Sequence, residues 1–320
     1  MKSLETDIIP LNPTFACMVT LSEVLKVSLG PCPACGANHW SPAGQVKDYS
    51  VTGEWFDLVE CMSCHLKTTY PQPKQAEIGQ YYASEDYVSH SDTRTGLINR
   101  LYHTAREYML RKKLKWVVKA SGLEKGSLLD VGAGTGHFAH FMKTRGWQIT
   151  ALEPDEKARR VAAGKLGLAI EPLEALGAQT ARSFDVITLW HVLEHVHDLS
   201  GYMDHFRTLL KPGGTLLIAV PNYTSRDADR YRAIWAAYDV PRHLWHFSPS
   251  SMQKLMAKHH FTLSEKIPMH LDAFYVSMLS EKYKGNKFSG SVAGFFSGLK
   301  TFLSAGKNVD NASSIIYVAH

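Results

Sequence analysis

The sequence has no long hydrophobic run, no large excess of one charge and no sign of a leader peptide. Its apolar stretches fall short of the ~18 residues that a membrane-spanning helix needs, and the stretch over 15–29 is interrupted by Glu23 and Lys26. Lysine and arginine number 35 against 30 aspartates and glutamates, and a formal charge of +5 does not by itself call for a polyanionic partner. We therefore expect a cytoplasmic protein with neither a membrane nor a nucleic acid as its partner.

The composition is also not that of a disordered chain. Hydrophobic residues make up 45% of the chain and charged residues 20%, as expected for a protein that folds around a sizeable core. At ~100–200 residues per domain, the 320 residues allow one large domain and one small domain.

Cysteine is scarce, and its placement is informative. Four of the five cysteines form two Cys-x-x-Cys pairs, Cys32/Cys35 and Cys61/Cys64, while Cys17 stands alone and is expected to be a buried thiol. Two such turns supply the four thiolates of a tetrahedral zinc site, although the spacer over 36–60 is longer than the ~15–20 residues of the common pattern. A redox pair would need only one such turn, and disulfides are rare in unsecreted chains, so the pattern favours a structural zinc ribbon.

The spacer between the cysteine pairs is acidic. It contains one lysine, against Asp48, Glu54, Asp57 and Glu60, and so lacks the positive footprint of a phosphate-binding surface. The ribbon is therefore predicted to pack on a larger domain or to cover a substrate. A zinc-ribbon protein that binds a nucleotide or RNA without turnover remains the alternative.

The rest of the chain alternates helical and strand-like segments. Apolar residues recur at helical spacing over 97–119, with basic residues elsewhere on the helix that we expect to be solvated. Beyond residue 125 the pattern predicts strands at 127–131, 148–152, 184–190, 214–220, 261–266 and 313–318, and helices at 136–143, 154–166, from 192 onward and at 248–260. Such alternation indicates an α/β fold with a doubly wound parallel sheet.

A glycine-rich loop follows the first of these strands, in the order Asp130-Val131-Gly132-Ala133-Gly134-Thr135-Gly136-His137. Glycines let the backbone approach a ligand closely, and the next helix points its free amides toward it. The dinucleotide fingerprint requires glycine where His137 stands, and Asp130 would repel a pyrophosphate but attract an ammonium group. Since Glu153 at the end of the second strand can accept ribose hydroxyls, the loop predicts a ligand with an adenosine head and an amino-acid tail.

These segments resemble the class I methyltransferases that use S-adenosylmethionine, in particular the ubiquinone-biosynthesis O-methyltransferases. The resemblance covers 125–320 and rests on 128–136, 152–154, 184–195 and 210–216; the ribbon half is similar to that of some sugar-modifying methyltransferases. It implies a Rossmann-like sheet of seven strands in the order 3-2-1-4-5-7-6, with strand 7 antiparallel. Combined with the cysteine pairs and with the long insertion after the fifth strand, it divides the chain into an N-terminal extension (1–30), a zinc ribbon (31–73), a helical linker covering the cofactor (74–124) and a methyltransferase domain (125–320) with a substrate lid (221–249).

The resemblance assigns site residues as well. It implies that the methionine part of the cofactor contacts Asp130, Gly132, Ala133, Gly134 and Gly136, the ribose Glu153 and Pro154, the adenine Leu173 or Glu174, and the sulfonium Leu189, Trp190 and His191. The expected cofactors are S-adenosylmethionine and a structural zinc ion held by Cys32, Cys35, Cys61 and Cys64.

The segment from His191 to His195 spells H-x-x-E-H, the pattern of inverted zinc peptidases. A peptidase needs both histidines in one helix, whereas His191 directly follows a predicted buried strand, so we reject that interpretation. In the related methyltransferases the corresponding E-x-x-E-H block is associated with a divalent cation. A second divalent metal at Glu194 and His195 is therefore one hypothesis; the other is that Glu194 caps or pairs locally while His195 lines the pocket.

Methyl transfer needs an aligned nucleophile, a site closed to water and, for a hydroxyl acceptor, a base. Within the proposed lid, His243 is a candidate base and Arg242 a candidate ligand for an acidic group of the substrate; His191 beside the sulfonium is the third catalytic candidate. A buried His243 that only bonds a backbone carbonyl is the competing interpretation. The sequence thus predicts methyl transfer to a small-molecule or saccharide-linked acceptor, with oxygen as the favoured atom.

Overall fold

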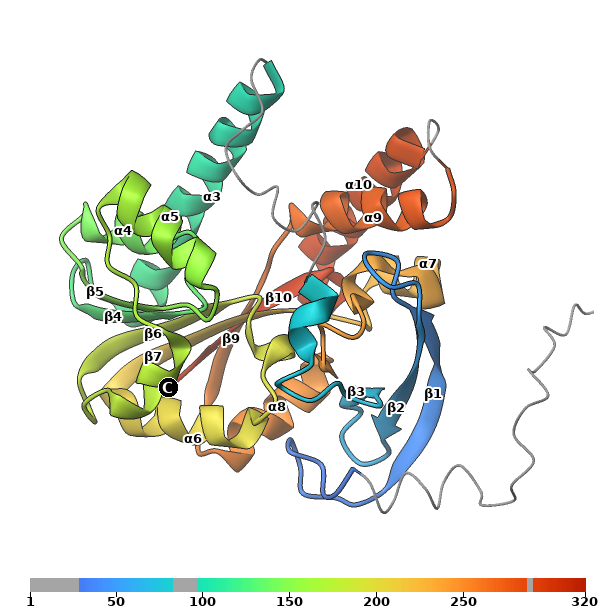
Figure 1. The fold of residues 1–320 in the computed structure, drawn as a ribbon, viewed down its shortest axis with the longest axis horizontal. Helices are drawn as coiled ribbons and strands as arrows, with labels where there is room; N and C mark the ends of the chain where they lie inside the picture. Colours follow the sequence, from blue (N-terminus) through green and yellow to red (C-terminus); the bar gives the residue numbers. More distant parts are fainter. Residues whose placement is uncertain (1–28, 83–96, 287–289) are drawn as a thin grey trace, which may run out of the picture.

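The computed structural model describes residues 29–82, 97–286 and 290–320, which form two sheets flanked by helices (Figure 1). The lone Cys17 and nearly all of the predicted N-terminal extension lie outside these residues. Within the described residues, no helix combines the length and the apolar character that crossing a bilayer requires.

The larger sheet has six strands in the order β5-β4-β6-β7-β10-β9. Their bounds are β4 (Ser127–Val131), β5 (Gln148–Leu152), β6 (Phe184–Trp190), β7 (Leu210–Pro221), β9 (Leu263–Pro268) and β10 (Ser314–Ala319). The first four pair in parallel, and β10 is antiparallel to both β7 and β9. The predicted doubly wound class and the antiparallel strand are therefore confirmed.

The prediction of seven strands was wrong for the described part of the chain. Where a strand would extend the sheet beyond β5, only one parallel bridge forms, between Leu152 and Glu171. Pro172 follows immediately and begins a 3₁₀ turn, η2 (Leu173–Ala178). Because proline has no amide hydrogen to donate, the pairing stops after that single bridge.

Each face of the larger sheet is covered by helices. On one face, α3 (Leu97–Ser121) and α4 (His137–Lys143) pack Val117, Phe138 and Met142 against the strands, and α5 (Glu156–Leu166) lies beside α4. On the other face lie α6 (Leu199–Leu209) and α8 (Pro249–Lys258) (Figure 1). The carboxyl ends of the parallel strands lie between the two helical layers, which is where such sheets bind ligands.

The helix predicted from residue 192 onward begins later than expected. The chain leaves β6 through His191, whose φ of 58° is left-handed, and then forms only a short 3₁₀ turn, η3 (Leu193–His195). Helix α6 starts at Leu199, where the side chain of Asp198 accepts a hydrogen bond from Gly201. The left-handed residue ends the regular backbone, and the aspartate cap sets the new start.

The smaller sheet is built from two segments that lie far apart in the sequence. Its order is β1 (Trp40–Lys47), β2 (Trp55–Cys61), β3 (Lys67–Tyr70) and β8 (Trp245–His246). The fourth strand comes from the segment predicted as a lid, which also contains α7 (Arg226–Tyr231), η4 (Arg232–Ile234) and η5 (Ala236–Tyr238). Trp235, Leu244 and Phe247 of this segment are buried, so it packs into the core and is tied to the cysteine-bearing sheet.

Candidate active site

The glycine loop directly follows β4 in the chain and lies where the parallel strands of the larger sheet end. Gly132 and Gly134 both have left-handed backbones, with φ of 70° and 56°. A Cβ at Gly132 would lie 2.4 Å from Cγ2 of Val192, whereas none of the described residues lies within 4 Å of a Cβ at Gly134. Glycine is therefore required at 132 by packing and at 134 by conformation, and the loop keeps open space beside Gly134.

Two buried carboxylates flank this loop. Asp130 is 1% exposed and accepts a hydrogen bond from Thr188 Oγ1 at 2.8 Å. Burial raises the pKa of Asp130 to about 7, although Thr188 and Lys113 act in the opposite direction. Glu153 accepts bonds from the amides of Gly134 (2.7 Å) and Asp155 (3.0 Å), and burial raises its pKa as well.

Lys113 of α3 is a site residue that the sequence reasoning missed. It was predicted on a solvated basic face, but its Nζ lies 4.4 Å from the ring centre of Trp190 and 5.5 Å from that of Phe138. Burial lowers the pKa of Lys113 to about 8, while Asp130 and Asp272 oppose the change. Its position four residues before the buried Val117 places it on the core-facing stripe, which is the signal that could have found it.

The other predicted cofactor residues lie along the same edge. The amide of Ala133 donates to the carbonyl of Leu152 at 2.9 Å, and Gly136 caps α4. Leu189 is fully buried in β6, and Trp190 ends that strand with an indole nitrogen that has no hydrogen-bond partner among the described residues. Pro154 follows β5 and is exposed, and beyond the single bridge η2 carries a half-buried Leu173 and an exposed Glu174.

His191 is held between two carboxylates. Its Nε2 lies 3.0 Å from Oδ2 of Asp272, and its Nδ1 lies 3.4 Å from Oε1 of Glu194. Burial alone would lower the pKa of His191, but these two contacts outweigh it and raise the pKa to about 10. The ring is therefore an imidazolium at neutral pH, which suits electrostatic positioning and not proton abstraction.

Glu194, His195 and His243 form a cluster whose ligand atoms all lie within 4.8 Å of one another. Glu194 is fully buried, and neither carboxylate oxygen has a hydrogen-bond partner among the described residues. Of the two local roles predicted for Glu194, the cap does not form, since the residue at the cap of η3 is Val192, but the local pairing does, with Nδ1 of His191 at 3.4 Å. The His191 ring, 3.4 Å from Oε1, supplies part of the compensation that this buried carboxylate needs, and a proton or a cation within the cluster would supply the rest.

Backbone carbonyls set the tautomers of the two histidines. Nδ1 of His243 lies 2.9 Å from the carbonyl of Ala237, and Nδ1 of His195 lies 3.0 Å from that of Arg242 and 3.0 Å from the Tyr82 hydroxyl. A carbonyl only accepts, so each neutral ring carries its proton on Nδ1 and a lone pair on Nε2. Burial lowers the pKa of His195 to about 4, which keeps that ring neutral.

Arg242 is placed as an internal clamp. It is 1% exposed, and its guanidinium donates to Asp48 at 2.9 Å, to Asp239 at 2.7 Å and to the carbonyl of Tyr81 at 2.8 Å. These contacts use its donors on the protein itself and give no support to the predicted contact with a substrate. They tie the loop that carries His243 to β1 and to the segment before α3.

The smaller sheet also holds this loop directly. The Thr69 hydroxyl of β3 donates to the carbonyl of His243 at 2.6 Å, and its amide donates to that of Leu244 at 3.0 Å. Thr68 donates a second bond to Leu244 at 3.0 Å. The position of His243 therefore depends on the hairpin that contains Cys61 and Cys64.

The four cysteines converge as predicted. Their Sγ atoms lie within 4.8 Å of one another, with 3.6 Å between Cys32 and Cys64 and 3.6 Å between Cys35 and Cys61. A tetrahedral zinc ion with Zn–S bonds of about 2.3 Å needs sulfur–sulfur separations of roughly 3.8 Å. The contact with Cys64 lowers the pKa of Cys32 to about 5 and raises that of Cys64, so a divalent cation would be needed for all four thiols to ionise together. The residues therefore fit a zinc ion.

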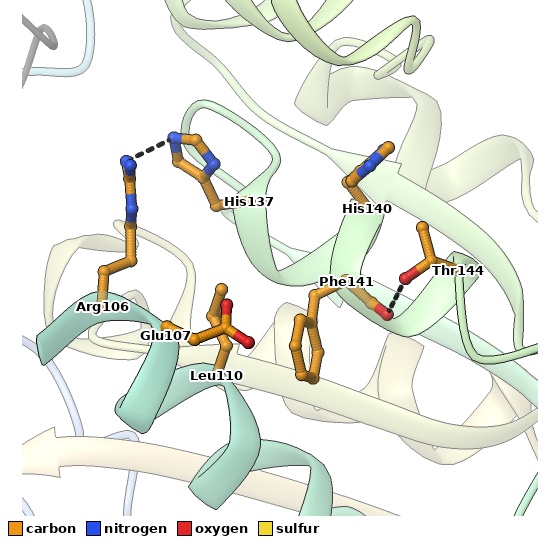
Figure 2. A pocket seen from close by; sticks show the side chains of 7 residues that line it. All are labelled: Arg106, Glu107, Leu110, His137, His140, Phe141 and Thr144. Atoms are coloured by element: carbon orange, nitrogen blue, oxygen red, sulfur yellow. Dashed lines mark hydrogen bonds between the residues drawn. The ribbon is translucent and has the colours of Figure 1, made fainter. Parts of the chain in front are cut away.

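A separate cavity of about 390 Å³ opens between α3 and α4 (Figure 2). It is lined by Arg106, Glu107, Leu110, His137, His140, Phe141 and Thr144. Nη1 of Arg106 donates to Nε2 of His137 at 2.8 Å, as Figure 2 shows. This bond anchors His137, the first residue of α4, to α3.

Comparison with known proteins identifies the fold's relatives. A family model described as a methyltransferase domain matches residues 101–266, just over half of the chain. The chain belongs to this methyltransferase family. The resemblance inferred from the glycine loop and the segments after it is thereby confirmed.

Curated relatives of this methyltransferase include two ubiquinone biosynthesis O-methyltransferases. The protein from Albidiferax ferrireducens is 36% identical over 118 residues, which cover 34% of this chain and 47% of the relative. The protein from Methylocella silvestris is 33% identical over 149 residues, covering 42% and 57%. The chain thus spans about half the length of the curated relatives it matches.

Among solved structures, the methyltransferase superimposes on Haemonchus contortus phosphoethanolamine N-methyltransferase 2 in complex with S-adenosyl-L-methionine. The TM-score is 0.49 at 17% identity, over 88% of this chain and 68% of the other.

Proposed function

We propose that this methyltransferase transfers a methyl group from S-adenosylmethionine to an oxygen atom of a small-molecule or saccharide-linked acceptor. The observation that carries the proposal is the presence of a buried acid, Asp130, and a half-buried cation, Lys113, that act on each other electrostatically beside the glycine loop. Opposite charges at one edge match the ammonium and carboxylate of an amino-acid tail. Glu153 at the next strand end is placed to accept ribose hydroxyls.

Oxygen is the proposed acceptor atom for two reasons. The relatives reported above are named O-methyltransferases, and the cluster at η3 contains a proton acceptor that a hydroxyl would need. Nε2 of His243 accepts the proton, and the Glu194 carboxylate stabilises the imidazolium that results. His191, already protonated between its carboxylates, orients Glu194 toward the cluster.

Two metal sites belong to the proposal. The first is a structural zinc ion on the four cysteines, which would set the hairpin between β2 and β3. The second, in which His243 is a ligand and does not act as the base, is a divalent cation on Glu194, His195 and His243, whose ligand atoms lie within 4.8 Å of one another. A nitrogen-rich donor set favours a transition metal over magnesium, and such an ion would acidify an acceptor hydroxyl as a Lewis acid.

Isothermal titration calorimetry with S-adenosylmethionine and its demethylated product tests the cofactor part. We expect micromolar binding that is lost in Gly134→Val, because valine at a φ of 56° is strained and would fill the space beside the loop. No binding by the unmodified chain would refute the enzyme proposal. Binding of RNA or a nucleotide instead would favour the alternative of a zinc-ribbon binding protein.

Radiolabelled methyl transfer to a panel of hydroxylated small molecules and saccharides tests the acceptor part. An O-methyl product seen by nuclear magnetic resonance supports the proposal, and methyl groups only on nitrogen or carbon would overturn the choice of oxygen. Metal analysis separates the two roles of the η3 cluster. Two ions per chain, falling to one in Glu194→Gln, support the second metal, and one ion in both proteins leaves His243 as the base.

A further inference from the structure

The hairpin of α9 (Asp272–Tyr283) and α10 (Gly290–Lys307), inserted between β9 and β10, has an apolar outer face. On α10, Val292, Phe295, Phe296 and Leu303 are 50–60% exposed. Beside them, Leu271, Tyr275 and Met278 of the α9 segment are 39–62% exposed. Large apolar side chains elsewhere on the described surface, such as Trp55 and Val161, are scattered along the chain, whereas these form two stripes on adjacent helices.

Close packing of the two helices explains why these side chains face outward. A Cβ at Gly294 would lie 2.6 Å from the backbone of Met278, and one at Gly298 would lie 2.7 Å from that of Phe274. Small residues therefore face α9 and let the backbones approach each other. At about 100° per residue, Val292, Phe296 and Leu303 point to the opposite side, while Phe295 lies on the flank with its ring 5.3 Å from that of Phe274. Burying the outer residues by rotating the helix would force large side chains into the α9 contact.

Among the described residues of the hairpin, the exposed charges are of one sign. Lys282, Lys284, Lys300 and Lys307 are exposed on the hairpin. Its two acidic residues are not on the outer face, because Asp272 is bonded to His191 and Glu281 is 2% exposed. An apolar stripe bordered by lysines and without exposed carboxylates is the complement of an anionic lipid interface.

We propose that the outer face of the α9–α10 hairpin binds the surface of an anionic lipid bilayer, with both helices lying in the interface. A second copy of the chain fits less well, because a two-fold contact would bring the same lysines against each other. The expectation of no membrane partner was drawn from the lack of a spanning segment, and surface binding of this kind needs none. This inference does not depend on the proposed methyl transfer.

The hairpin is also joined to the candidate active site. Asp272, the first residue of α9, holds His191 at the exit of β6. Figure 1 shows the hairpin projecting beside the larger sheet on the side of the carboxyl strand ends. A chain docked through this face would hold the candidate active site near the lipid surface, where acceptors carried on a lipid are presented.

Vesicle sedimentation with the full chain tests the inference. The probes are phosphatidylcholine vesicles with and without phosphatidylglycerol. We expect binding only when phosphatidylglycerol is present, and a loss of at least ~10-fold in the partition coefficient for Phe296→Ser/Leu303→Ser. Lys300→Glu/Lys307→Glu should lose at least ~10-fold as well, at roughly 1 kcal/mol for each lysine removed and more for reversal.

Controls keep the result specific to the hairpin. Trp55→Ser removes an aromatic side chain that is 60% exposed on β2 and should bind vesicles as the unmodified chain does. Thermal unfolding of all variants should be unchanged, because the replaced side chains are exposed. The inference is overturned by absence of vesicle binding, by equal binding to neutral vesicles, by retained binding in the serine or glutamate pairs, or by a dimer that the serine pair abolishes without any vesicle binding.

Discussion

The clamp at Arg242 allows the sharpest test of how the candidate site is assembled. In Arg242→Met the side chain keeps much of its volume but loses its charge and every donor. Asp48 is 1% exposed and Asp239 has a side chain that is 22% exposed, so both carboxylates would lose the cation beside them. Removing one partner of a buried ion pair costs about 3–5 kcal/mol, because the remaining charge is left without compensation.

This cost translates into a measurable change in the melting temperature. With an unfolding entropy of about 2.1 cal/mol/K per residue, a chain of 320 residues loses roughly 1.5 °C for each kcal/mol. Arg242→Met should therefore melt roughly 4–8 °C below the unmodified protein at pH 7 by calorimetry. Asp48→Asn combined with Arg242→Met should recover part of the loss, because the pair is coupled.

The pH dependence gives an independent check with a definite sign. Burial raises the pKa values of Asp48 and Asp239, but Arg242 outweighs burial and holds both below their ordinary range. Stability from a lowered acid pKa is present above the ordinary value and is lost as pH falls through the lowered one. The difference between the two proteins should therefore shrink as pH falls below about 4. An unchanged melting temperature, with a raised KM for the acceptor, would show that Arg242 binds substrate instead.

Four further predictions follow from contacts in the site. Gly132→Ala should weaken S-adenosylmethionine binding at least ~10-fold in calorimetry, because its Cβ would lie 2.4 Å from Val192. Affinity for the cofactor should rise with pH through about 7 as Asp130 ionises, and a titration of Asp130→Asn should show no such rise; a parallel rise in both proteins would contradict the role of this carboxylate. Glu194→Gln should lower kcat by ~10²-fold with unchanged cofactor affinity, and near-normal turnover would exclude the η3 cluster from the reaction. Thr69→Val should lower kcat by about 5–100-fold while the KM for the cofactor stays constant, and Thr69→Ser should restore it; loss of cofactor binding in the valine variant would indicate general unfolding.

Local patterns predicted much of the fold and the cofactor edge. The strands after residue 125 appear close to their predicted bounds because buried β-branched runs and glycine turns are short-range signals. The four cysteines could be grouped because ligand spacing is itself a local property. The seventh strand failed for an equally local reason, since Pro172 stops the pairing beyond Leu152.

The position of Lys113, the η3 cluster and the buried side of α10 depend on contacts between segments that are distant in the sequence. Lys113 sits 17 residues before Asp130, and no helical pattern reveals that its ammonium lies over Trp190. The η3 cluster needed His243 to be brought to Glu194 by a loop whose backbone is held by β3. Which side of α10 is buried likewise depended on its partner helix.

The amino-acid sequence by itself determined the class of fold, the glycine loop with its acids, and the grouping of the four cysteines, since each depends on spacing along the chain. Only the tertiary structure decided that Arg242 is a clamp, that His191 is charged, and that the hairpin turns its aromatic residues outward. These properties depend on burial and on partners remote in the chain, because the free energy of a charge or an apolar surface is set by what surrounds it in space.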